Sequence, residues 1–403
     1  MSKKSTLFVE SLSLNTKKGY KSTIKKYEQF HGKTIDSLVE EALDEQTRQV
    51  PPHLLSVISR IEDFQNHLVE EDMVHGAIQT NIGRIKTIYK RNRVVLPYIT
   101  PLNPKRTRRR DYIEFKDILT KNELICALTH MRPPAQARAM AMIQGGLSNA
   151  ECDLLTTRSF IDELHKYHQC DDDLDALKWL SKRGHPVIWV TRLVRQKTKK
   201  PYYAILGAEA VNKIASAKLY EYELPSNNQV ISDKLLNTHR DSFGRLCRKV
   251  SDACGFPKVA EESKFRPHNL RRFHATYIGG SALSYEEHSL ITNAEIDEMQ
   301  GRGKTGVQDT YIKTNPLRQK VLYAKVMNNV SLYNEYGYAI VDGDVEVYLV
   351  DPLKENEKLK KRVKNLSSQL SQRQRASERV KKLREDLGNE VFDQLIGEIL
   401  NDS

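Results

Sequence analysis

Apolar residues recur at helical spacing through the first hundred residues of the chain. They form three stripes: Tyr20, Ile24, Tyr27 and Phe30; Ile61, Phe64 and Leu68; and Ile78, Ile82, Ile85 and Tyr89. Asn15-Thr16 stands in front of the first stripe and can cap a helix there. We expect residues 1–100 to form a helical domain with the stripes in its core and basic residues, including Lys86 and Lys90, on its surface.

From residue 118 the helical pattern is interrupted by two strand candidates. The segment from Thr120 to Glu123 has the capping-box pattern and predicts a helix start. The strand candidates, 187–190 and 202–206, flank a basic turn. Helices are expected over 121–131, 134–145, 151–155, 208–219, 236–254 and 268–280. The predicted fold is mainly α with a small β-sheet, and residues 118–330 are predicted to form the second domain.

A proline-spaced basic segment separates the two domains. Prolines at 97, 101 and 104 precede a dense run of cations. The run contains Lys105, Arg106, Arg108, Arg109 and Arg110. This pattern predicts an interdomain linker over 101–117. The run is either a solvated charged segment or a set of phosphate contacts.

The C-terminal part of the chain has two further patterns. Residues 331–351 contain Asp342-Gly343-Asp344 between β-rich runs, which predicts a hairpin, and its role is open. Residues 352–403 contain a short heptad seam with a slip in register, followed by an amphipathic segment. The seam predicts either an intermolecular coiled coil or a helix that folds back on its own domain.

The bulk composition narrows the class of partner. Lys and Arg number 64 against 52 Asp and Glu, a net charge of +12 that favours a polyanion such as nucleic acid over a membrane. Five scattered cysteines show no C-x-x-C spacing, so we expect buried thiols and neither a disulfide framework nor a metal site. The N-terminus lacks an apolar signal segment, so an intracellular, cytoplasmic protein is expected.

Two segments of the C-terminal half carry chemistry that suits DNA cleavage. Arg271 follows His268 by three residues, so both would face one side of a helix. Arg302 and Tyr311 lie further along, in the segment that begins at Gly301. Arginine binds phosphate oxygens bidentately, and a tyrosine can attack the phosphorus reversibly. Lys197, in the basic turn, could donate a proton to the leaving oxygen. No metal-nuclease or P-loop pattern is present, and no cofactor is expected.

The chain resembles the tyrosine recombinase (phage-integrase) family over roughly residues 10–325. The stretch 16–30 resembles the first helix of that family's core-binding domain, and Gln144 to Glu151 resembles its first catalytic box. The stretch 195–206 resembles its β-hairpin with the catalytic lysine. The segments at His268 and at 301–311 resemble the two remaining boxes and are the specific part of the match.

The resemblance implies a role for each candidate residue. Tyr311 would be the nucleophile and Lys197 the general acid. His268, Arg271 and Arg302 would hold the phosphate, and Glu151 would support the first box. Candidate DNA contacts outside the linker are Lys86, Lys90, Lys199, Arg272 and Lys304. The implied assembly is a helical core-binding domain and a catalytic domain, working as a tetramer on double-stranded DNA. An arginine at 302 resembles archaeal and archaeal-virus members.

One position departs from the family pattern. Where the family's first box carries an arginine three residues before the glutamate, this chain has Ser148, followed by Asn149. Either another arginine, such as Arg158 or Arg272, replaces it, or the chain is a silenced form, or it binds DNA without cutting it efficiently. The rival functions are therefore a DNA-binding architectural or regulatory protein and a type IB topoisomerase, which uses the same chemistry without paired sites.

Overall fold

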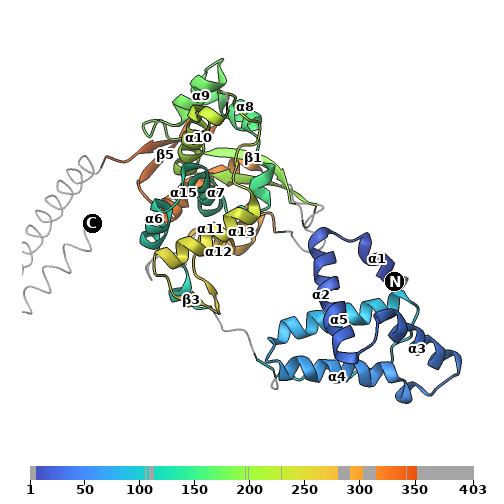
Figure 1. The fold of residues 1–403 in the computed structure, drawn as a ribbon. Coiled ribbons are helices and arrows are strands. Elements are labelled where there is room, and N and C mark those ends of the chain that lie inside the picture. The colour runs from blue at the N-terminus through green and yellow to red at the C-terminus, as the bar shows by residue number, and fades with distance from the viewer. Residues whose placement is uncertain are drawn as a thin grey trace, which may run out of the picture. The chain divides into compact units, whose positions relative to one another are not determined.

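The structure is a computed structural model, and it describes residues 6–104, 107–108, 113–195, 197, 199–227, 229–279, 291–302, 315–341 and 343–351. The chain divides into two compact units, Met1–Ile113 and Glu114–Ser403 (Figure 1). The expected coiled coil over 352–403 lies outside the described residues. No helix in the described part of the chain has the length and apolar character needed to span a membrane.

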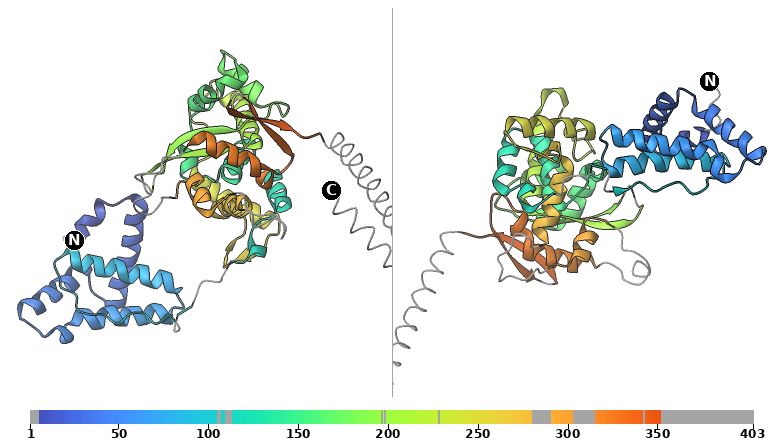
Figure 2. Two further views of the ribbon diagram at one scale, coloured as in Figure 1. Left: turned by 180° about the vertical axis from the view of Figure 1, so that it is seen from behind. Right: turned by 90° about the horizontal axis from the view of Figure 1, so that it is seen from below.

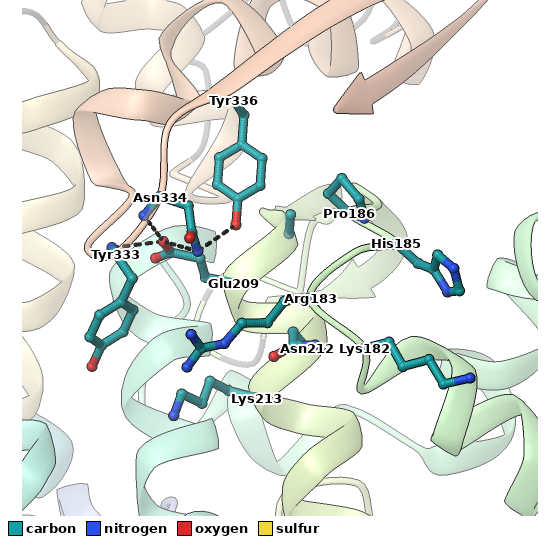
Figure 3. Close-up of a pocket in the computed structure, with 11 residues that line it drawn as sticks. Lys182, Arg183, His185, Pro186, Glu209, Asn212, Lys213, Tyr333, Asn334 and Tyr336 are labelled. Atoms are coloured by element: carbon teal, nitrogen blue, oxygen red, sulfur yellow. Dashed lines mark hydrogen bonds between the residues drawn. The ribbon is translucent and has the colours of Figure 1, made fainter. Parts of the chain in front are cut away.

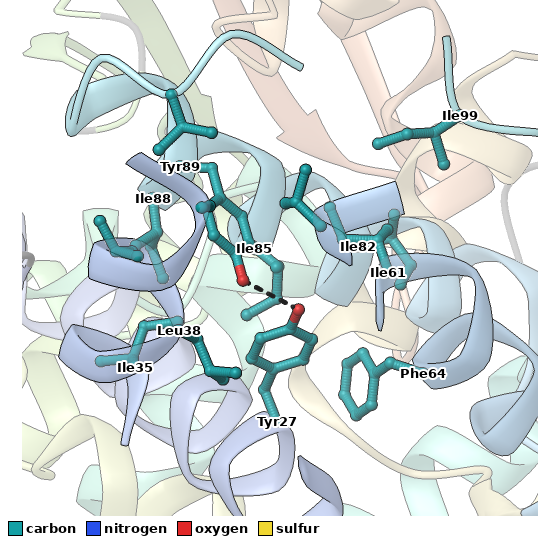
Figure 4. Close-up of a cluster of buried hydrophobic side chains, with 14 of the residues drawn as sticks. Tyr27, Ile35, Leu38, Ile61, Phe64, Ile82, Ile85, Ile88, Tyr89 and Ile99 are labelled. Atoms are coloured by element: carbon teal, nitrogen blue, oxygen red, sulfur yellow. Dashed lines mark hydrogen bonds between the residues drawn. The ribbon is translucent and has the colours of Figure 1, made fainter. Parts of the chain in front are cut away.

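The first unit is helical. Its elements are α1 (Leu7–Glu10), α2 (Leu14–His31), α3 (Ile35–Thr47), the short η2 (Pro52–Leu54), α4 (Ser56–Glu70) and α5 (His75–Arg91). The three apolar stripes lie on α2, α4 and α5. Tyr27, Phe64 and Tyr89 are fully buried, and the Tyr27 and Tyr89 hydroxyls are 3.1 Å apart (Figure 4). The expected cap at Asn15-Thr16 is wrong, because α2 begins earlier and Ser13 is its N-cap residue.

The second unit contains the remaining helices and all the strands that the structure describes. Its α-helices are α6 (Lys121–Thr129), α7 (Pro133–Gly145), α8 (Thr157–His168), α9 (Asp173–Leu180), α10 (Ala208–Glu223), α11 (Arg240–Ala253), α12 (Pro267–Ile278), α13 (Asn293–Met299) and α15 (Pro316–Val330). Short 3-10 helices are η4 (Phe115–Asp117), η5 (Glu151–Leu154) and η6 (Pro225–Asn227). The described residues are therefore mostly helical, as the apolar periodicity predicted.

The strands form three separate antiparallel pairs. These are β1 (Trp189–Val194) with β2 (Pro201–Leu206), β3 (Lys258–Val259) with β4 (Glu262–Ser263), and β5 (Tyr336–Val341) with β6 (Asp344–Leu349). The β5–β6 hairpin packs against α15, red beside orange in Figure 2. The predicted hairpin after residue 331 is thus confirmed.

Local signals in the sequence explain several element boundaries. The Thr120 side chain accepts from the Glu123 N–H, and Glu123 accepts from the Thr120 N–H, so the predicted capping box starts α6 as expected. The first strand was predicted too early. Val187 and Ile188 lie outside β1, because β2 ends at Leu206, opposite Trp189, and offers them no backbone partner.

Candidate functional site

Glu151 is the centre of a buried charged cluster. It follows the end of α7, where the chain turns at Gly146 with a φ of 59°. Only 2% of Glu151 is exposed. Its Oε2 accepts from the Ser148 backbone N–H at 2.7 Å and lies 3.0 Å from Nη1 of Arg271. A buried carboxylate requires such partners, so Glu151 fixes the position of the arginine beside it.

Arg271 projects from the first half of α12 and is buried. Besides its ion pair with Glu151, its Nη2 donates to the backbone carbonyl of Gln300. Burial lowers the pKa of Arg271, and the charge of Glu151 opposes that effect. The guanidinium therefore stays in place as a cation, held between a carboxylate and a carbonyl oxygen.

Arg195, directly after β1, reaches the same carboxylate from the hairpin. Its Nε lies 3.6 Å from Oε1 of Glu151, and its Nη1 donates to the Gly301 carbonyl at 2.7 Å. The sequence identified this residue only as the start of the basic turn. Nothing in the local pattern distinguishes it from the other cations of that turn, because its contacts are made with distant segments.

The backbone at 300–301 is fixed on several sides. Gln300 is fully buried, and its Nε2 donates to the Arg271 carbonyl at 3.2 Å and lies 3.0 Å from Nδ1 of His274. Gly301 has a φ of 62°, and a Cβ there would lie 2.7 Å from the Tyr202 ring. Only glycine fits this turn. The peptide that leads into Arg302 is therefore held in one position.

His268 and Arg302 are exposed at the edge of the cluster. The pKa of His268 is lowered, first by partial desolvation and then by the positive charges of Arg272, Arg266, Arg271 and Arg302. His268 is thus neutral at pH 7 in a positive field that would attract an anion. Arg302 pairs at 3.2 Å with Asp297, and both side chains are solvent-exposed, so this pair is weak.

The remaining described candidates do not join Glu151. Lys197 and Lys199 are exposed on the hairpin turn, and the described contacts include no ion pair between either lysine and Glu151. Arg272 is half-buried on α12 and donates to Asn269 at 3.1 Å. Arg158 is exposed on α8 and pairs with Asp162 at 2.8 Å, so it does not join the cluster around Glu151.

The candidates in the first unit lie on α5 and in the linker. Lys90 is exposed and Lys86 half-buried, and burial followed by the charge of Lys90 lowers the pKa of Lys86. Arg108 pairs with Asp72 at 3.4 Å. The following candidates lie outside the described residues: Lys105, Arg106, Arg109, Arg110, Lys304 and Tyr311.

Arg138, on α7, was not singled out from the sequence, although it holds the turn between α7 and Glu151. Its side chain is fully buried and donates to Asn149 Oδ1 at 2.8 Å, to the Thr238 carbonyl at 2.7 Å and to Asp153 at 2.8 Å. Asn149 is thus the partner of a structural arginine. Arg138 faces Asp153 and not Glu151, so its role is to shape the turn that carries Glu151.

A concave region lies beside α10 and is structural (Figure 3). Lys182, Arg183 and Lys213 line it. Glu209 is buried there and accepts three backbone N–H groups, from residues 332, 333 and 334, at 2.8 to 2.9 Å. Because backbone donors occupy its carboxylate, Glu209 joins the segment after α15 to α10.

The cysteines differ from expectation. Cys152 and Cys247 are buried as predicted, whereas the prediction is wrong for Cys126, which is exposed, and for Cys170 and Cys254, which are partly exposed. Cys126, His130 and Cys254 also come together in space. This group could not be predicted from the sequence, because its two parts are separated by more than a hundred residues.

Comparisons with known proteins find a weak structural similarity. The sequence matches no protein-family model and no curated protein. The structure is similar to the crystal structure of XerA recombinase, with a TM-score of 0.31 and 16% sequence identity. That comparison covers 79% of this chain and 94% of the XerA chain.

Proposed function

We propose that the protein is a site-specific DNA recombinase that cuts and rejoins strands through a 3′-phosphotyrosyl intermediate. The observation that carries the proposal is the cluster in which Arg195 and Arg271 share Glu151. His268 lies within the field of Arg271 and Arg302 at its edge. Fixed cations of this kind bind the non-bridging oxygens of a phosphodiester and stabilise the charge that develops during displacement.

Each step of the proposed reaction has a residue in this chain. The Tyr311 oxygen attacks the phosphorus, and the bond from phosphorus to the 5′-oxygen breaks. The leaving oxygen takes a proton from the ammonium of Lys197, and the phenolic proton passes to neutral His268 or to water. A free 5′-hydroxyl from a partner strand reverses the step, so the number of phosphodiester bonds is unchanged. No metal or nucleotide is consumed.

Arg195 takes the place of the arginine missing at position 148. Ser148 caps the turn around Glu151: its Oγ accepts from the Glu151 N–H at 3.3 Å, and its own N–H donates to the carboxylate. The serine thus supplies no charge, and Arg195 brings a second guanidinium to the same carboxylate from the hairpin. Arg195 and Arg271 would then contact the two non-bridging oxygens.

DNA binding is proposed to come mainly from phosphate contacts. Lys86 and Lys90 on α5, Lys199 on the hairpin turn and Arg272 on α12 are candidates, together with the cations of residues 105–110. Binding of this kind releases counterions and weakens steeply with salt. Strand exchange between two duplexes would need a tetramer on DNA, to which the heptad seam over 352–403 could contribute.

A suicide substrate tests the catalytic proposal. In a duplex nicked just downstream of the cleavage point, attack releases a short fragment that carries the free 5′-hydroxyl. Because this fragment diffuses away, the step cannot be reversed and the covalent adduct accumulates. Tyr311→Phe should abolish the adduct, whereas Tyr338→Phe, on the exposed β5 strand, should leave it unchanged. Arg195→Gln should slow adduct formation by roughly 10²- to 10³-fold, the usual cost of losing one charge-stabilising group.

The absence of a cation at Ser148 favours a second candidate, a DNA-binding architectural protein of the same fold without catalysis. Tight DNA binding with no adduct in the wild type would establish that candidate. Relaxation of supercoiled DNA without paired sites would instead indicate topoisomerase activity. Adduct formation together with exchange between two cognate sites supports the recombinase.

A further inference from the structure

Two cysteines and a histidine meet at the ends of two helices in the second unit. Cys126 lies in the last turn of α6, and His130 is the residue that follows this helix. Cys254 directly follows α11. His130 and Cys254 are 124 positions apart in the sequence. The fold, and not a local sequence pattern, therefore brings them together. None of the three contacts the cluster around Glu151 among the contacts described.

Their spacing matches the corners of a tetrahedral metal site. The two sulfurs are 3.6 Å apart, and Sγ of Cys254 lies 3.6 Å from Nδ1 of His130. Zinc bonds of about 2.3 Å to sulfur and about 2.0 Å to nitrogen, at tetrahedral angles, put such atoms about 3.5–3.8 Å apart. The third separation, between Sγ of Cys126 and the imidazole nitrogen, is within 4.8 Å, so a small rotation of the ring completes the set.

The other contacts of the imidazole are weak enough to be exchanged. Nδ1 of His130 lies 3.0 Å from the Cys126 carbonyl and 3.3 Å from Oγ1 of Thr129. The ring is exposed, so water can replace both contacts at little cost when the ring turns. Cys126 is also exposed, which leaves a path for an ion and an open fourth position for water or another ligand.

We propose that Cys126, His130 and Cys254 bind a zinc ion and thereby join the end of α6 to the end of α11. Two thiolates and one imidazole form a donor set that zinc favours over harder divalent ions. A disulfide between the two cysteines would use the same sulfurs, but it would give the histidine no reason to lie at the third corner. Lys264, which follows β4, pairs with Glu123 of α6 at 2.7 Å, so α6 is also tied to the part of the chain that follows α11.

Cobalt and zinc measurements on the full chain test the proposal independently of any DNA chemistry. Reduced, chelator-treated protein titrated with Co²⁺ should develop the thiolate charge-transfer band and the d–d bands of a tetrahedral site, and Zn²⁺ should bleach both. Elemental analysis should find about one zinc per chain. Cys126→Ser, Cys254→Ser and His130→Ala should each lower metal affinity at least tenfold. Cys170→Ser, at a partly exposed cysteine elsewhere, should not.

Three results would overturn the inference. The first is a reduced full chain that shows no thiolate band with Co²⁺. The second is a response of equal strength in Cys126→Ser and Cys170→Ser, since binding would then lie elsewhere. The third is a disulfide between Cys126 and Cys254 in protein purified without reductant, combined with failure of the reduced form to bind zinc. None of these metal-binding measurements depends on adduct formation with DNA. The zinc site and the proposed function are therefore tested separately.

Discussion

Replacing Glu151 by glutamine tests whether this carboxylate holds the two arginines together. The substitution keeps the shape and an oxygen for the Ser148 N–H, but it removes the negative charge between Arg195 and Arg271. Removing one partner of a buried ion pair costs about 3–5 kcal/mol, and the retained hydrogen bond places Glu151→Gln near the lower end, about 3 kcal/mol. For a domain of this size class, that is a fall in Tm of roughly 6–12 °C.

The assay is thermal unfolding of the variant beside a surface control. Asp162→Asn breaks an exposed pair with Arg158 on α8 and should cost about 1 kcal/mol or less. Inorganic phosphate should raise the Tm of Glu151→Gln more than that of the wild type, because an anion replaces the missing charge. If Glu151→Gln unfolds no earlier than Asp162→Asn, the carboxylate does not organise the cluster. Equal stabilisation of variant and wild type by phosphate would show that the anion does not replace the missing charge between the arginines.

Three further predictions concern the residues around the cluster. The first is that the free energy of unfolding should fall by about 1.4 kcal/mol per pH unit below about pH 6.5. Burial lowers the pKa of His274 in the folded protein to about 3, so in this range only the unfolded chain takes up the proton. In urea unfolding, His274→Gln should lose this part of the pH dependence. The second is that Gly146→Ala should lower the Tm, because the residue has a φ of 59° and an added Cβ would lie 2.6 Å from the His274 ring. The control Gly244→Ala, in α11, meets no neighbouring atom and should stabilise the protein by about 0.5–1 kcal/mol. Arg138→Lys should cost on the order of 3 kcal/mol in denaturant unfolding, because an ammonium cannot reach Asn149, Thr238 and Asp153 together; a loss under 1 kcal/mol would contradict this account.

The elements that could be predicted from the sequence are those set by local interactions. The apolar stripes on α4 and α5 and the capping box at Thr120 depend on residues three or four positions apart, which the sequence shows directly. The start of β1 could not be read in this way. Val187 and Ile188 are apolar and buried like strand residues, but the end of β2 at Leu206 decides where pairing stops.

The site shows the same division between local and distant information. The spacing of His268 and Arg271 on one helix is a local pattern, and the sequence reveals it. The pairing of Glu151 with Arg271 spans 120 positions, and the contact of Arg195 with Gly301 spans 106. Neither contact produces a periodic pattern in the sequence. The proximity of Cys126 and Cys254 could not be predicted from the sequence for the same reason, since the spacing rules that mark metal sites apply only to neighbouring ligands.

Arg195 connects the two segments of the chain that carry residues of the proposed reaction. Its guanidinium joins the base of the hairpin, whose turn carries Lys197, to the Gly301 carbonyl. Arg271 holds the preceding carbonyl, of Gln300, at the point from which the chain runs on towards Tyr311. The segments that precede the proposed general acid and the proposed nucleophile are therefore both held, through Arg195 and Arg271, at one carboxylate, Glu151. With Ser148 in place of an arginine, the second cation of the proposed reaction would come from the hairpin that carries Lys197, so that placing the phosphate and placing the proton donor would be one structural event.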